Sequence, residues 1–206
     1  MSRPGRSAKT TGRPRAFDVP AVIDAAQDAF AEHGPELTSI VDLEERTGID
    51  RSSLYNTFGS KQALFEAALQ SYLEEGIEAR LHELRQPNAH LSTVAAFFIA
   101  MAQGFRANPE QAERGCMLVN AVAELGAQDS RTAPAVAYRD TLRSAFLTAL
   151  RQAAVRGEID PKRLQARTKL LASLTMGLFV TARIDPGDAA EVCENVAAEV
   201  RAWKLS

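Results

Sequence analysis

Three glycines divide the first third of this chain into short segments, and each segment carries apolar residues three or four positions apart. The glycines are Gly34, Gly48 and Gly59, and glycine is a common stop signal for a helix. Residues that can cap a new helix follow each glycine, namely Ser39, Asp50 and Ser60. The pattern predicts three short helices and then a long one that begins near Ser60, with the middle pair joined as a helix-turn-helix.

Helical periodicity continues through the rest of the chain. Proline and glycine breaks separate further helices, which we predict near residues 91–106, 110–126, 131–156, 161–183 and 187–204. No alternating pattern of useful length indicates a strand, and no internal repeat is visible. The predicted fold class is all-α.

Bulk composition fits a soluble globular protein of one generous or two small domains, with 206 residues, 46% hydrophobic and 24% charged. The longest apolar stretch, 170–182, is shorter than the roughly 20 residues that span a bilayer, and the N-terminus lacks the apolar core of a signal peptide. Cys116 and Cys193 are far apart and in no metal-like spacing. We therefore expect a cytoplasmic protein that has no membrane partner, metal or cofactor.

Charge is distributed unevenly along the N-terminal part, although the net charge of the whole chain is only −2. Residues 1–17 hold five cations and no acid, and we expect residues 1–16 to be a disordered basic arm. Residues 18–60 hold nine acids against two cations, Arg46 and Arg51, which is unfavourable for binding nucleic acid. Most of those acids are expected on the first helix and the outer side of the second, away from the face of the third.

The predicted helix at 51–58 has two unlike sides. Leu54 and Phe58 fall together on one side, and the other positions carry small or hydrogen-bonding groups without an acid: Ser52, Ser53, Tyr55 and Asn56, with Arg51 in the first turn. Short polar side chains and a forked cation suit a helix inserted in the major groove. A helix of a bundle whose Ser and Asn are merely solvated would show the same wheel, so this helix alone leaves both readings open.

The wider frame from Phe17 to Leu69 resembles the DNA-binding domain of TetR-family transcriptional regulators. Its most specific part is the run Y-x-x-F-x-S-K-x-x-L, formed by Tyr55, Phe58, Ser60, Lys61 and Leu64. The resemblance implies a three-helix helix-turn-helix DNA-binding domain over 17–62 and a helical ligand-binding and dimerisation domain over 63–206.

The resemblance also implies roles for single residues. Arg51, Ser52, Ser53 and Asn56 would face the major groove, Tyr55 and Lys61 would contact phosphates, Thr38 and Ser39 would meet phosphate, and Thr47 would lie near the DNA backbone. Glu44 and Asp50 depart from the residues common in the family. Arg13 and Arg15, on either side of a proline, fit a narrow minor groove, although a solubilising tail would have the same composition.

The C-terminal two-thirds would hold an effector pocket and a dimer interface by the same resemblance. The pocket candidates are the large or polar side chains Phe97, Met101, Phe105, Met117, Asn120 and Tyr138, which suit an apolar or amphipathic small molecule. The helices near 161–183 and 187–204 have broad apolar faces, and two from each subunit can form a four-helix bundle.

The resulting hypothesis is a ligand-responsive transcriptional regulator, a repressor that binds a palindromic double-stranded DNA operator as a homodimer and is released by an effector. The alternatives are an activator of the same family and a helical interaction or sensor module without DNA binding. An enzyme is not expected, because His33, His82 and His90 show no ligand spacing and no nucleophile, phosphate-loop or dinucleotide motif is present.

Overall fold

The computed structural model describes residues 17–203, and within that range every regular element is helical. The all-α prediction is confirmed. The helices, in chain order, are α1 Val19–Leu37, α2 Ile40–Thr47, α3 Arg51–Phe58, α4 Lys61–Ser71, α5 Glu78–Leu81, α6 Leu91–Ala107, α7 Pro109–Arg114, α8 Met117–Leu125, α9 Ala133–Val155, α10 Leu164–Ile184 and α11 Pro186–Ala202. Short 3-10 turns lie at Glu83–Arg85, Ser130–Thr132 and Pro161–Arg163.

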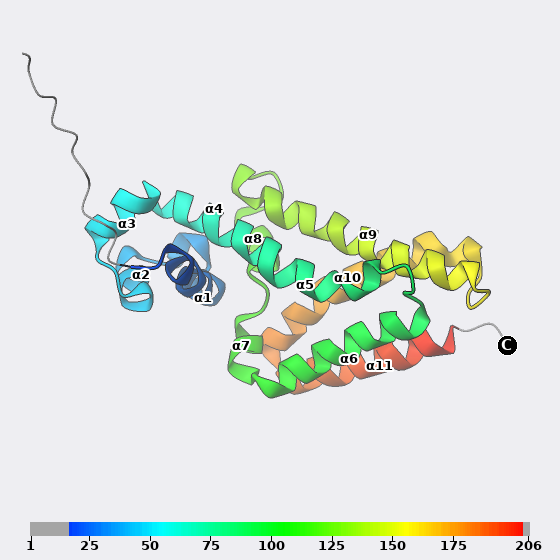
Figure 1. Cartoon of the computed structure of the whole chain (residues 1–206). Helices are drawn as coiled ribbons and strands as arrows, with labels where there is room; N and C mark the ends of the chain where they lie inside the picture. Colours follow the sequence, from blue (N-terminus) through cyan, green and yellow to red (C-terminus); the bar gives the residue numbers. More distant parts are fainter. Residues whose placement is uncertain (1–16, 204–206) are drawn as a thin grey trace, which may run out of the picture.

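The N-terminal helices form a small unit at one end of the molecule (Figure 1). Leu43 and Leu54 are buried in it, and the rings of Phe30 and Phe65 meet edge to face with centroids 5.1 Å apart. Apolar side chains from α1 and α4 thus supply the core against which the two short helices pack. The predicted stop at Gly34 is present, since its φ of 80° and ψ of 165° interrupt the regular helix of α1.

The long helix that leaves this unit contains a π turn. Helix α4 continues without a break into Tyr72–Ile77, a π segment, and then into α5. The amide of Glu78 donates to the carbonyl of Leu73, five residues back, where an α-helix would use the fourth. Single π turns of this kind often lie at functional sites, and Tyr72 proves to line a cavity.

The C-terminal helices pack around the far part of this long helix (Figure 1). Helix α11 lies along α6, and α10 packs against both α9 and α11. The predicted helix at 110–126 is wrong as one element. It is split into α7 and α8 because Gly115 adopts φ 74° and ψ −150°, and a Cβ atom there would lie 2.8 Å from the side chain of Arg183.

Candidate nucleic-acid interface and effector cavity

Side-chain caps fix the start of both helices of the helix-turn-helix. The amide of Ser39 donates to Asp42 Oδ2 at 2.7 Å and the amide of Asp42 donates to Ser39 Oγ at 3.1 Å, which forms a capping box at the predicted cap Ser39. The backbone and hydroxyl hydrogen bonds from Ser39 lower the pKa of the Asp42 carboxyl. Gly48 closes α2 in the left-handed conformation, and Asp50 caps α3 by accepting the amide of Ser53 at 2.8 Å.

Helix α3 presents a polar outer face. Leu54 is buried, whereas Arg51, Ser52, Tyr55 and Asn56 are exposed. Asn56 Nδ2 donates to Ser52 Oγ at 3.3 Å, and the Arg51 guanidinium lies over the Tyr55 ring at 5.5 Å. Ser53, also predicted to face DNA, is half-buried. The helix carries short donors and acceptors and one cation, and its surface can approach the edges of bases.

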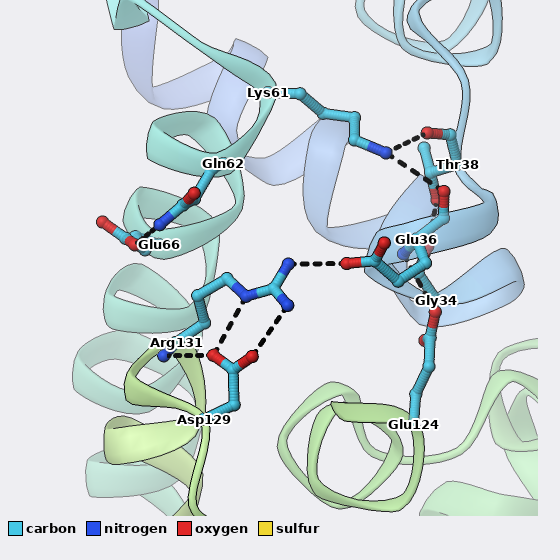
Figure 2. A network of polar contacts seen from close by, with 9 residues as sticks. All are labelled: Gly34, Glu36, Thr38, Lys61, Gln62, Glu66, Glu124, Asp129 and Arg131. Carbon is cyan, nitrogen blue, oxygen red and sulfur yellow. Dashed lines mark hydrogen bonds and ion pairs between the residues drawn. The ribbon is translucent and has the colours of Figure 1, made fainter. Parts of the chain in front are cut away.

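One predicted phosphate contact, that of Thr38, is wrong, and the other, that of Lys61, stays a prediction with fewer free donors. The Thr38 side chain is fully buried and its hydroxyl donates to the carbonyl of Gly34 at 2.6 Å, so it cannot reach DNA. Lys61 Nζ donates to the carbonyls of Glu36 and Thr38 at 3.1 and 3.0 Å, which ties α4 to the end of α1 (Figure 2). An ammonium group has three donors, so one is left for a phosphate.

Thr47, the other threonine of the predicted set, is half-buried, and its hydroxyl donates to the carbonyl of Leu43 at 2.5 Å. Ser39 remains exposed at the start of α2. Arg13 and Arg15 lie outside the described residues.

The acidic residues that seemed unfavourable for DNA binding are largely engaged within the protein. Asp28, Glu32 and Glu36 form ion pairs with Arg114, Arg46 and Arg131, respectively. Hydrogen bonding from Arg46 lowers the pKa of Glu32. Glu44, one of the two unusual residues, accepts the amide of Arg51 at 2.5 Å and so adds a second cap to α3. Most of these acids thus have partners within the protein, and α3 itself carries no acid.

A second polar network joins the N-terminal unit to the C-terminal helices (Figure 2). Glu124 of α8 accepts the amide of Glu36 at 2.9 Å. Arg131, at the connection between α8 and α9, pairs with Glu36 at 2.6 Å and with Asp129 at 2.8 Å. Hydrogen bonds from Arg131 lower the pKa of Asp129 to about 2. The C-terminal end of α1 is thus held by α8 and by the connection between α8 and α9.

A cavity of about 700 Å³ lies between the two parts of the molecule. Three of the candidate pocket residues, Phe97, Met101 and Phe105, all on α6, line this cavity. The other three candidates are not among the lining residues. Met117 and Tyr138 are buried in the core, and Asn120 donates to the carbonyls of Ala31 and Arg114 at 3.2 and 2.8 Å.

Sequence reasoning missed most of the cavity wall. It includes Tyr72 and Arg80 of the long helix, and Gln27, Asp28 and Ala31 of α1. No periodic pattern marks these positions, because they come together only through the crossing of three helices. Cys116 is fully buried, and burial raises the pKa of its thiol, so it is not a reactive group in this state.

The comparisons with known proteins agree with this geometry. Residues 22–68 match the family described as bacterial regulatory proteins, tetR family. The HTH-type transcriptional repressor ComR of Escherichia coli (strain K12) is 32% identical over 180 residues, covering 85% of this chain and 84% of ComR. The chain belongs to the TetR family. This TetR-family protein is a DNA-binding transcriptional regulator and not an enzyme.

Other relatives of this TetR-family chain agree. The uncharacterized HTH-type transcriptional regulator YezE of Bacillus subtilis (strain 168) is 33% identical over 150 residues, covering 72% of this chain and 76% of YezE. Among solved structures, the TetR family transcriptional regulator CifR, a cysteine mutant complexed with a 26bp double-strand operator DNA, has a TM-score of 0.77 at 28% identity. That match covers 93% of this chain and 100% of CifR.

Proposed function

We propose that the protein is a homodimeric repressor that inserts α3 of each subunit into the major groove of a palindromic operator. The exposed, acid-free outer face of α3 is the observation that carries this proposal. Arg51 and Asn56 have the groups to pair with guanine and adenine edges, and Ser52 and Ser53 are short enough for close approach. Tyr55, Ser39 and the free donor of Lys61 would contact phosphates, as would Thr47 by its position. ComR is named as a repressor, which supports repression rather than activation by this protein.

Dimerisation rests on helix α10. Leu170, Val180 and Ile184 are exposed on it, at 51%, 48% and 82% of their full surface, while Leu171 and Leu178 point inward. The apolar face of α11 packs largely against α6 instead, since Val200 is buried and Val192 and Val196 are half-buried. We therefore assign α10 the larger share of the subunit contact. Two half-sites one helical turn apart, about 34–36 Å, or a multiple of it, would then be read together.

The sequence suggested two domains, 17–62 and 63–206, and residues of both line the cavity. Ala31 of the DNA-binding domain and Tyr72 of the long helix both line it. An effector that binds only one arrangement of these helices would shift the population toward that arrangement and change the spacing of the two α3 helices. Among residues 17–203, no helix is long and apolar enough to cross a membrane. We propose that the protein acts in the cytoplasm.

Footprinting on DNA upstream of its own and adjacent genes tests this proposal. We expect salt-sensitive, sequence-selective protection that Arg51→Ala and Tyr55→Ala weaken, while Arg151→Ala, an exposed cation on α9, leaves it unchanged. Deletion of residues 1–15 should lower the affinity if Arg13 and Arg15 enter the minor groove. In vitro transcription distinguishes a repressor from an activator. Absence of selective DNA binding would contradict the proposal and favour a sensor module without a DNA target.

A further inference from the structure

One side of the effector cavity is an elongated groove along α6, where the lining residues have small side chains or none. Ser92, Ala96, Ala100 and Gly104 line it at four-residue intervals along one face of α6. At 1.5 Å per residue this face extends for roughly 18 Å. A Cβ atom placed on Gly104 would meet nothing within 4 Å, so the groove is empty there.

The walls of the groove are apolar and include Leu84, Phe97, Met101, Phe105 and Phe179. The rings of Phe105 and Phe179 meet edge to face with centroids 5.8 Å apart, which fixes one wall. Such a lining favours a ligand with a long apolar body.

One cation in the wall is not held in an ion pair among the described residues. Four charged residues line the cavity, and two of them, Asp28 and Arg114, pair with each other at 3.1 Å. Arg80 forms no ion pair with any carboxylate of residues 17–203. Glu83 also lines the cavity and is exposed.

Arg80 and Tyr72 line the same cavity, and Arg80 is also exposed to solvent. Burial raises the pKa of Tyr72, Cys116 and Tyr138, and the guanidinium of Arg80 opposes that rise at all three. The wall of the cavity therefore carries the guanidinium of Arg80 and the hydroxyl of Tyr72, two hydrogen-bond donors suited to a carboxylate or another oxyanion.

We propose that this groove binds an elongated amphipathic anion, with its apolar body along Ala96, Ala100 and Gly104 and its anionic group at Arg80 and Tyr72. This inference rests on the proposed function, because it names the chemical class of the effector. It makes Arg80 a specificity-determining residue and leaves the contacts with DNA unchanged.

Binding of three probes with the same chain tests the proposal: dodecanoate, dodecanol and dodecyltrimethylammonium, each titrated calorimetrically below its micelle concentration. Dodecanoate should bind about 10- to 100-fold more tightly than the other two, as expected for a charge-assisted hydrogen bond. Arg80→Met should abolish the preference and keep the binding of dodecanol. Gly104→Phe should weaken all three probes, because the ring fills the groove. The matched control Arg151→Met should behave as the wild type.

Equal affinity for the three probes, no binding of dodecanoate, or a preference that survives Arg80→Met would each overturn the inference. Operator binding by the same preparations is measured in parallel without any probe. If DNA is bound selectively and the probes fail, the effector class is wrong and the regulator stands. If the probes bind as expected and DNA is not bound, the regulatory function fails while the ligand site stands.

Discussion

Gly34 occupies a position where both the backbone and a neighbouring side chain exclude a larger residue. Its φ of 80° and ψ of 165° belong to a region that only glycine adopts readily, and strain there costs about 1–3 kcal/mol for other residues. A Cβ atom would lie 1.9 Å from Glu124 Oε2, so the carboxylate must move. That movement breaks the 2.9 Å hydrogen bond from the amide of Glu36, worth about 1 kcal/mol. Gly34→Ala should therefore lower the free energy of unfolding by about 2–4 kcal/mol.

A double-mutant cycle separates the two contributions. In the Glu124→Ala background the clash is absent, and Gly34→Ala should cost only the backbone part, so its cost should fall by about 1 kcal/mol. The assay is urea unfolding followed by circular dichroism at one fixed protein concentration, because the stability of the proposed dimer would depend on concentration. Gly104→Ala is the control. It lies in a helix with open space around it and should stabilise the protein by about 0.5–1 kcal/mol. An unchanged cost of Gly34→Ala in the Glu124→Ala background would refute the contact between α8 and the end of α1.

Three further predictions concern the N-terminal unit and its connection to the C-terminal helices. Arg131→Ala should lower Tm at pH 5, and the difference in Tm from the wild type should shrink as the pH falls from about 4 to about 2. The reason is that the pKa of Asp129 is lowered from 3.8 to about 2, so the pairing with Arg131 is lost as Asp129 becomes protonated. A difference in Tm that stays constant over this range would disprove the linkage. Arg51→Ala should reduce the slope of log affinity for the operator against log salt concentration by about 1 if Arg51 contacts a phosphate, and should relax the base preference at one operator position if Arg51 reads a guanine. Competition with operator variants decides between these two outcomes. No change in either property would show that Arg51 is not part of the interface. Leu54→Ala should destabilise the protein by about 2–5 kcal/mol, since Leu54 is the buried anchor of α3, whereas Ser52→Ala on the exposed side should leave urea unfolding unchanged.

Local signals were sufficient to predict the N-terminal unit. The caps at Ser39, Asp50 and Ser60 and the stops at Gly34, Gly48 and Gly59 all lie where the sequence placed them. These signals act within one helical turn, so the order of residues alone reveals them.

The cavity was predicted only in part because its wall depends on packing between distant segments. Phe97 could be chosen for its size, but nothing in the sequence near Arg80 shows that this residue lines the same cavity. Asn120 looked like a ligand group on an apolar helix, yet its amide serves two backbone carbonyls, one of them 89 residues away. The predicted phosphate contact of Thr38 was wrong for a related reason, since its hydroxyl donates to the carbonyl of Gly34 in α1.

The π turn at Tyr72–Ile77 sets the rotational phase of everything beyond it. Tyr72 and Arg80 are eight positions apart, which in an uninterrupted α-helix would point them about 80° apart around the axis. The π turn absorbs one residue, so the two side chains point as if seven positions separated them, about 20° apart. In an uninterrupted α-helix Arg80 would point about 100° further around the axis relative to Tyr72 than it does here. Removing one residue from this turn, for example Gly76, would restore α-helical geometry without rotating α5 relative to α4. The chain between Tyr72 and Arg80 can therefore be shortened by one residue while both side chains keep their direction toward the cavity.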